Sequence, residues 1–258
     1  MRARSVRAPD RPRARDVLLE AAHVYARFPL RVIGTASAVF VPVVAGEAFV
    51  HAWAEHAHHA GQPSALFVGL AVAGSTALAD TVATIFFAAV MDTTVVANRR
   101  NQAPPPIRRI LRRLPYGPLL IADLIAGLAA GAGAAAGVLP GLVIFTLLSI
   151  VAPVILIERL GPFAALRRSA RLTWRWFATS LVAVTLPATI EGLAVEQLIA
   201  GTRGLGTLPF AVAAEAFGVT IGAFVGLCEV ALGHALVEAD HAPTPTDAGH
   251  EDGASRLA

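Results

Sequence analysis

Long apolar tracts alternate along the chain with short segments rich in arginine. The tracts cover residues 32–54, 65–91, 119–157, 177–200 and 208–237. Because an α-helix rises about 1.5 Å per residue, about 20 apolar residues cross the roughly 30 Å hydrocarbon core of a bilayer. Four tracts fit one crossing each, and tract 119–157 fits two, with Pro140-Gly141 predicted to break it into a hairpin. The pattern predicts an all-α integral membrane protein with six transmembrane helices.

The composition supports a membrane protein over a soluble one. Of the 258 residues, 55% are hydrophobic and 15% are charged. The mean hydropathy is +0.63. A soluble domain needs polar residues on every element that touches water, and the apolar tracts leave no room for them.

The positions of the basic residues predict the orientation of the chain. Lysine is absent, so all 21 basic residues are arginine. They gather before the first span, between spans two and three (99–113), and between spans four and five (159–175), whereas the opposite loops carry only Arg203. Positively charged loops stay on the cytoplasmic side. We therefore expect a multi-pass protein of the cell membrane with both termini cytoplasmic.

The two ends of the chain differ in composition from the tracts between them. Residues 1–15 are rich in arginine and proline, and residues 238–258 are polar, so we expect both to be disordered. Residues 16–237 then form the six-helix transmembrane domain. Ala52-Trp53-Ala54 leaves open a cleaved signal peptide. The apolar stretch before it is longer than such a leader needs, so an uncleaved first span is favoured.

Three arginine-bearing segments predict amphipathic helices at the cytoplasmic interface, each before a transmembrane hairpin. They cover residues 16–28, 107–114 and 162–177, where apolar and charged positions fall on different faces. Pro29 marks the bend from the first of them into the membrane. We expect the arginines to contact anionic lipid headgroups, at about 1 kcal/mol each. A pI near 9.9 might suggest nucleic acid, but topology explains these charges, and no nucleic-acid partner is expected.

Small residues and prolines predict how the spans pack. Glycines recur every four residues at 218, 222 and 226, and pairs with this spacing occur at 127 and 131 and at 133 and 137. This spacing allows close helix contact in lipid, either within the chain or in a homo-oligomer, and internal packing is favoured. Pro42, Pro153 and Pro187 lie within spans and predict kinks or unwound turns.

One connector carries a recognisable pattern. It has Glu158, then Gly161, then Ala165-Leu166-Arg167-Arg168-Ser169, then Leu172 and the pair Trp176-Phe177. The pattern resembles bacterial six-span proteins related to the membrane domain of glycerophosphoryl diester phosphodiesterases, and segment 16–29 is similar to the opening helix of that group.

The resemblance implies a membrane protein without an assigned reaction. In two-domain members, hydrolysis belongs to a separate soluble domain for which we expect no room here, so no catalytic residue is carried over. We expect Glu158, Arg168, Ser169 and Arg171 to form a cytoplasmic network that fixes the helix against spans four and five.

Inserting an acidic residue near the bilayer centre costs about 2.5–3.5 kcal/mol, so acidic residues within spans call for an explanation. Two interpretations stay open: an outward-facing acidic cavity for protons, cations or an amine, or structural hydrogen bonding and pairing, which is somewhat favoured. The candidates for the cavity, with Asp80 deepest, are Asp80, Glu47, Glu191, Glu196 and Glu215.

Other chemistries have weaker support. His51, Glu55 and His59 share a helix face at i, i+4 and i+8 and could bind a divalent metal, but a wet loop using histidine as a polar residue is favoured. The motifs of nucleotide, dinucleotide and zinc-protease sites are absent from the sequence, as is the serine-hydrolase elbow. We expect no cofactor.

Three classes of function follow, in order of preference. The first is a non-enzymatic accessory or scaffold component of envelope or lipid-related processes, with a membrane-protein partner or a second copy of the chain possible. The second is a proton- or cation-coupled transporter or channel that uses the intramembrane acids. The third is a membrane-embedded enzyme.

Overall fold

The computed structural model describes residues 12–59, 65–202 and 208–242. Within helices, side chains are not described at positions 47–59, 65–73, 75–77, 80, 196, 198–202 and 208–216. Over the described residues the chain is helical, with no strand. Six helical stretches are long and apolar enough to cross a membrane. The predicted all-α fold and the number of candidate spans are confirmed.

The first, second and sixth candidate spans each belong to one long helix. They are α2 (Pro29–His59), α3 (Ala65–Arg99) and α11 (Leu208–His241). The third candidate is α5 (Tyr116–Ala136). The fourth and fifth are divided into shorter pieces. The pieces are α6 (Val138–Leu148) with α7 (Val151–Glu158), and α9 (Phe177–Ser180) with η1 (Leu181–Thr185) and α10 (Leu186–Thr202).

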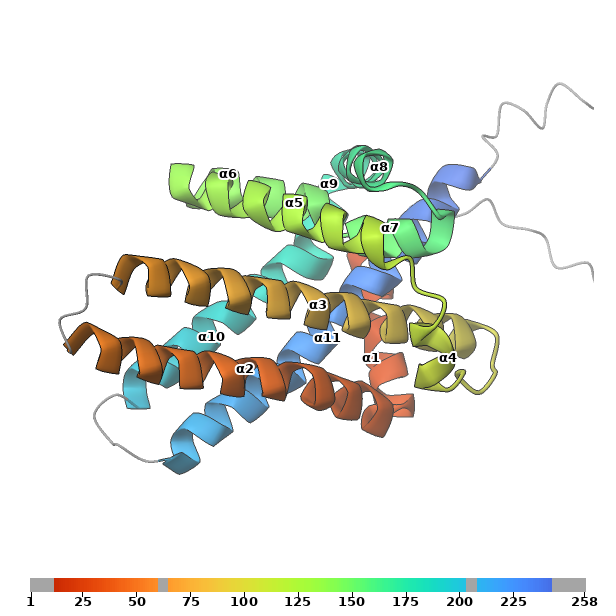
Figure 1. Cartoon of the computed structure of the whole chain (residues 1–258). Helices are drawn as coiled ribbons and strands as arrows, with labels where there is room; N and C mark the ends of the chain where they lie inside the picture. The colour runs from red at the N-terminus through yellow and green to blue at the C-terminus, as the bar shows by residue number, and fades with distance from the viewer. Residues whose placement is uncertain (1–11, 60–64, 203–207, 243–258) are drawn as a thin grey trace, which may run out of the picture.

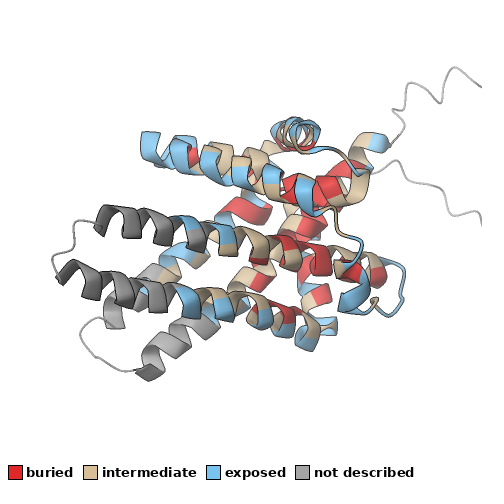
Figure 2. Ribbon diagram, in the orientation of Figure 1, coloured by how far each residue is buried: buried red, intermediate tan, exposed pale blue. Residues whose placement is uncertain are grey.

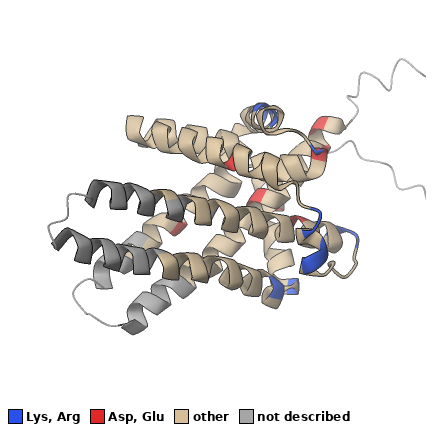
Figure 3. Cartoon of the chain, in the orientation of Figure 1, with Lys and Arg blue, Asp and Glu red and all other residues tan. Residues whose placement is uncertain are grey.

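Three further helices lie at one end of the bundle. They are α1 (Ala14–Arg27), α4 (Ile107–Leu111) and α8 (Pro162–Arg175). In Figure 1, α1 crosses the bundle at this end and α8 is seen end-on beside α7. We refer to this end, with the C-terminal turns of α3, α7 and α11, as the basic end, because the arginines of the described residues gather there (Figure 3).

Among the described residues, the buried side chains are most frequent toward the basic end (Figure 2). Met91 on α3 and Leu232 and Leu236 on α11 are fully buried there. Val17, Ala21 and Val24 of α1 are buried against them as part of one hydrophobic cluster. At the far end of α5 and α6 the side chains are exposed, as at Leu128 and Leu139. Large exposed apolar side chains are expected on helices that face lipid, where apolar burial gives little drive to associate.

The hairpin between spans three and four turns at Gly137, three residues before the predicted break at Pro140-Gly141. Gly137 has φ 143° and ψ 159°, which only glycine adopts readily. Pro140 falls in the first turn of α6, where its missing N–H has no helical partner to lose. Gly141 instead provides close packing, since a Cβ there would lie 2.9 Å from the backbone of Ala134 on α5.

Two of the three span prolines accompany a local change of helix. α6 and α7 are separated at Ser149-Ile150, and Pro153 can neither donate to the carbonyl of Ser149 nor fit its ring beside it. In span five, the π-helical turn η1 directly precedes Pro187, and the N–H of Leu186 bonds to the Leu181 carbonyl. Wider turns of this kind accommodate a proline ring. Pro42, by contrast, lies inside a continuous α2.

The helix boundaries at the two ends of the chain differ from the predicted ones by a few residues. α1 begins at Ala14, so it includes the last two positions assigned to a disordered tail. α11 continues through His241, four residues into the segment predicted as a polar tail. Those four residues include Glu238 and Asp240, which make ion pairs with other helices. Residues 1–11 and 243–258 lie outside the described part of the chain.

Candidate functional site

The C-terminal turns of α11 are the centre of a polar network at the basic end. Three side chains there, His234, Glu238 and Asp240, each bind a different set of helices. The last turn of a helix has four carbonyls without a helical donor and carries a partial negative charge, so arginines are favourable neighbours there. The network joins helices that are distant in sequence.

Arg168 on α8 joins α7 to α11. Its Nη2 lies 2.9 Å from Oε1 of Glu158, and its Nη1 lies 2.7 Å from Oδ2 of Asp240. Arg175 binds the other oxygen of Asp240 at 3.0 Å. The hydrogen bond with Glu158 is the largest cause that raises the pKa of the Arg168 guanidinium, although partial burial opposes the rise. The Arg168 and Glu158 side chains are 16% and 14% exposed, so solvent screens this pair only weakly.

Arg99 makes the corresponding connection on the other side of α11. Its Nε and Nη2 bind the two carboxylate oxygens of Glu20 on α1 at 2.5 and 2.8 Å, and its Nη1 lies 2.5 Å from Glu238. Two parallel N–H···O bonds to one carboxylate fix the orientation as well as the distance. α1, α3 and α11 are therefore held together at their polar ends.

A third set of contacts connects α3 to its neighbours. Asp92 Oδ1 lies 2.8 Å from His234 Nε2 of α11. Arg31, in the first turn of α2, donates to the hydroxyl of Thr94 at 3.0 Å and to the carbonyl of Pro105 at 2.8 Å. These bonds close the basic end around α3.

Ser169, a predicted network residue, binds backbone and not the Glu158–Arg168 pair. Its hydroxyl donates to the carbonyl of Leu147 at 2.8 Å. The Thr173 hydroxyl lies 3.0 Å from the same oxygen and 2.8 Å from the carbonyl of Ser169, so its single proton can be donated to either acceptor. Leu147 lies just before the break between α6 and α7, where helical acceptors lose their usual donors. α8 thus packs its polar side against the interruption in span four.

The buried face of α8 consists mostly of small and hydroxyl-bearing residues. Ala165, Ser169, Leu172 and Thr173 are buried, while Arg168 is partly buried within its ion pairs. Arg171, also expected in the network, is exposed and makes no side-chain hydrogen bond or ion pair among the described residues. The structure brings Glu158, Arg168 and Ser169 to one helix junction and leaves Arg171 facing outward.

The predicted acidic cavity is described at only one of its five positions. Asp80, Glu47, Glu196 and Glu215 lie on α3, α2, α10 and α11, but their side chains are outside the described residues. Glu191 on α10 is half-buried, and its Oε1 would lie 2.7 Å from a Cβ added at Gly222 of α11. Glu229, which the cavity hypothesis did not include, interacts electrostatically with both Asp123 and Glu191. Three spans therefore contribute an acid to one region.

The glycines of α11 pack inside the bundle. A Cβ added at Gly226 would lie 2.5 Å from the ring of Phe87, and one at Gly218 would lie 3.5 Å from Val195. Gly127 and Gly131 on α5 have no neighbour within 4 Å of such a Cβ. The α11 glycines therefore make contacts between helices of one chain, as favoured from the sequence.

The histidine positions proposed for a metal lie on α2, whose helix continues through His59. The i, i+4, i+8 spacing of His51, Glu55 and His59 thus falls on a helix as assumed, but their side chains lie outside the described residues. Among the side chains that the structure does describe, no group of three metal-binding residues occurs.

The sequence missed Asp92, His234, Glu238 and Asp240 as members of the network. One signal was available: α11 carries polar residues at 234, 238 and 241, and a spacing of three or four predicts a polar stripe on one helix face.

Comparison of the chain with protein-family models, with curated proteins and with solved structures finds no match. The resemblance of segments 16–29 and 158–177 to the glycerophosphoryl diester phosphodiesterase membrane domain stays a prediction.

Proposed function

We propose that this chain is an integral protein of the cell membrane, with the basic end and both termini in the cytoplasm. It acts without a catalytic site of its own, as an accessory or scaffold component of an envelope or lipid-related process. Its partners are anionic lipid headgroups and a membrane protein, which includes a second copy of the chain.

The division of arginines at the basic end is the observation that supports this proposal. Arg99 and Arg168 pair with carboxylates of neighbouring helices, so ion pairs connect the helices at this end of the bundle. Another set is exposed and, among the described residues, without an ion pair or side-chain hydrogen bond. These are Arg100, Arg108, Arg109, Arg112, Arg113, Arg159, Arg167 and Arg171. A set of connected helices with an outward cationic surface suits attachment to a membrane surface or an acidic partner.

Exposed aromatic side chains flank the outward arginines of α8. Phe163 is 72% exposed and Trp174 is 68% exposed, one near each end of the helix, with Arg167 and Arg171 between them. Aromatic rings beside arginines are typical of residues at the headgroup level of a bilayer. This favours an α8 that lies flat at the interface with its other face packed on spans four and five.

The accessory role is tested by affinity purification in mild detergent, with identification of co-purifying proteins and lipids. We expect a defined partner that is retained by the wild type and lost when Arg108, Arg167 and Arg171 are changed to Gln. Arg203→Gln, predicted at the opposite side of the membrane, is the matched control and should retain it. Recovery of the wild type with no reproducible partner and no enriched anionic lipid would contradict the proposal.

A second candidate, a proton- or cation-coupled transporter, is favoured by the acids of three spans. Glu229 on α11 interacts electrostatically with Asp123 on α5 and with Glu191 on α10. Intramembrane acids that face one another are typical of proton relays as well as of structural hydrogen bonding. Proton flux in reconstituted vesicles separates the two: flux abolished by Glu229→Gln and by Asp80→Asn would support transport. Equal flux through vesicles with and without the protein would exclude it.

A further inference from the structure

A pocket of about 360 Å³ opens at the basic end between α3, α4 and the turn that joins α7 to α8. Three arginines line it: Arg109, Arg113 and Arg159. All three are exposed and belong to the outward set without a partner among the described residues. The pocket therefore gathers three guanidinium groups from two separate segments, and none of the three is in an ion pair among the described residues.

The one acidic residue of the pocket is already engaged. Asp92 lines the wall formed by α3, and its Oδ1 lies 2.8 Å from His234 of α11. Thr93 and the Pro105 segment supply the remaining polar surface. The lining thus carries an excess of positive charge beside neutral hydrogen-bonding groups, a combination that favours an anion over a cation.

Arg159 reaches the pocket from an unusual backbone position. It ends α7 in the left-handed conformation, with φ 57° and ψ 34°, which a residue with a Cβ rarely adopts. The preceding residue, Glu158, points to Arg168 of α8. The left-handed turn lets two adjacent side chains serve different places, one the ion-pair network and the other the pocket.

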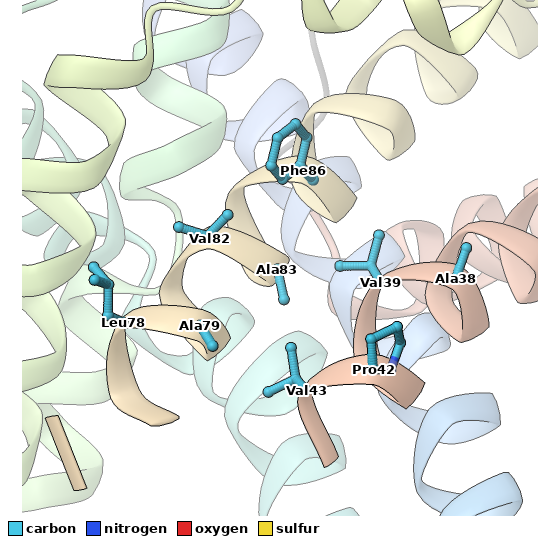
Figure 4. Close-up of a pocket in the computed structure, with 9 residues that line it drawn as sticks. All are labelled: Ala38, Val39, Pro42, Val43, Leu78, Ala79, Val82, Ala83 and Phe86. Atoms are coloured by element: carbon cyan, nitrogen blue, oxygen red, sulfur yellow. The ribbon is translucent and has the colours of Figure 1, made fainter. Parts of the chain in front are cut away.

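An apolar groove of about 550 Å³ lies further along α3, between α2 and α3 (Figure 4). Its lining is entirely apolar, and Val82 and Phe86 of α3 are part of it. Ala89 and Thr93 of the basic pocket follow at i+7 and i+11 from Val82, so they lie on the same side of the helix. Phe86 also packs against Tyr116, with ring centroids 5.9 Å apart. One face of α3 therefore leads from a cationic pocket to an apolar groove.

We propose that this face of α3 binds one anionic phospholipid. Its phosphate lies among Arg109, Arg113 and Arg159, and one acyl chain follows α3 into the groove beside Phe86. Guanidinium groups bind phosphate oxygens through paired N–H···O bonds. A zwitterionic lipid should bind less tightly, because the three arginines repel the positively charged group of its headgroup. The inference rests on the proposed location of the basic end at the cytoplasmic surface, where anionic lipids present their headgroups.

The test measures lipid binding to the purified full-length protein in detergent by native mass spectrometry. It compares phosphatidylglycerol with phosphatidylcholine of identical acyl chains. We expect one retained phosphatidylglycerol per chain, with at least tenfold preference over phosphatidylcholine. Changing Arg109, Arg113 and Arg159 to Gln should reduce its binding tenfold or more. The control removes the same charge outside the pocket, through Arg15→Gln, Arg100→Gln and Arg112→Gln at exposed positions, and should change binding less than twofold.

Equal losses in the two triple variants would overturn the pocket, because they would show attraction to net charge alone. If the variant that includes Arg159→Gln does not fold, the double variant of Arg109 and Arg113 keeps the turn intact. It should still lose binding severalfold, and unchanged binding would overturn the proposal.

Two further arms separate a lipid from a soluble anion. Inorganic phosphate should displace phosphatidylglycerol only at concentrations at least a hundredfold higher than those at which the lipid binds. Ala79→Trp fills the groove and should weaken phosphatidylglycerol binding severalfold without changing the effect of inorganic phosphate. If phosphate binds as tightly as the lipid and Ala79→Trp has no effect, the occupant is a free anion. Loss of the lipid site alone would leave the purified partner of the proposed scaffold unaffected, so the two proposals fail separately.

Discussion

The Ser169 hydroxyl donates a hydrogen bond of 2.8 Å to the carbonyl oxygen of Leu147, 22 residues earlier in the chain. The acceptor belongs to the last turn of α6, before the break that precedes Pro153. In a bilayer, a backbone carbonyl without a donor costs several kcal/mol, so a broken span needs a neighbour that satisfies it. α8 is that neighbour, which couples a helix of the basic end to an interruption within span four.

Removing both hydroxyl donors near the Leu147 carbonyl should reduce stability by more than the sum of the two single removals. Ser169→Ala leaves Thr173 to satisfy the carbonyl, so we expect a loss of about 1 kcal/mol in the free energy of unfolding. The double variant with Thr173→Val strips the carbonyl and should cost about 1–3 kcal/mol more than the sum of the singles. Unfolding in detergent by a graded denaturant, followed by tryptophan fluorescence, measures each value.

Thr189→Val is the control for this pair, because among the described residues the Thr189 hydroxyl bonds to the Thr185 carbonyl of its own span and to no other helix. We expect it to cost no more than either single variant. Additive effects of Ser169→Ala and Thr173→Val would show that α8 does not satisfy the break.

Two of the four carboxylates that pair with arginine in the network, Glu158 and Glu238, should differ in their contribution to stability. Glu158 is 14% exposed, whereas Glu238 is 65% exposed. Glu158→Gln leaves Arg168 partly buried beside a neutral amide and should destabilise the fold by roughly 1–3 kcal/mol, between the values for exposed and buried pairs. Glu238→Gln should cost at most about 1 kcal/mol and lose that effect in high salt. Thermal unfolding at low and high ionic strength checks both, and equal effects would contradict the burial-based ranking.

Three glycine-to-alanine changes test the packing of the spans. Gly226→Ala places a Cβ 2.5 Å from the ring of Phe87, which is itself buried, so we expect a loss of about 1–3 kcal/mol. Gly218→Ala meets Val195 at an ordinary 3.5 Å and should be nearly neutral. Gly131→Ala meets nothing within 4 Å and should stabilise α5 by up to about 1 kcal/mol through helix propensity. A destabilised Gly131→Ala would instead place a second chain against that face, which size-exclusion chromatography would detect.

Tyr25 predicts a loss of stability in alkali. Burial raises the pKa of its phenol, whose hydroxyl donates to the Thr220 carbonyl at 3.3 Å. The folded state therefore holds the phenolic proton more tightly than the unfolded state. The contribution of Tyr25 to the free energy of unfolding is present below about pH 10 and declines as pH rises through the pKa of the folded state. Tyr25→Phe cannot ionise, so its unfolding midpoint should fall less between pH 9 and pH 11.5 than that of the wild type. Parallel pH profiles for the two proteins would contradict this assignment.

The periodic features of the structure could be predicted from the sequence. Hydropathy and helix length together predicted six candidate spans, because each tract is near the length that a bilayer requires. Pro153 and Pro187 predicted irregular helix, since a proline in a helix interior lacks an N–H donor and its ring crowds the preceding turn. Pro42 carried the same prediction, but α2 continues through it. The α5–α6 turn was misplaced by three residues because Pro140 is tolerated in a first helical turn, while Gly137 alone provides the required backbone angles.

The pairing of polar side chains could be predicted only in part. Glu158 and Arg168 are ten residues apart and joined by one turn, so a local pattern was enough to associate them. Asp92 and His234 are 142 residues apart, and no periodicity in a single chain shows which helices become neighbours. Asp240 was assigned to a polar tail because a helix that extends past the membrane looks the same in composition as a disordered end.

The most direct test of the account is the side of the membrane on which the basic end lies. Cys228 is buried, and replacing it with alanine allows single cysteines to be placed at Gln102, between α3 and α4, and at Leu139, in the exposed α5–α6 hairpin. A membrane-impermeant maleimide should label Leu139→Cys in intact cells and Gln102→Cys only in inverted vesicles. Labelling of Gln102→Cys in intact cells would contradict the cytoplasmic placement of the basic end, and labelling of both positions from one side would contradict the transmembrane bundle itself.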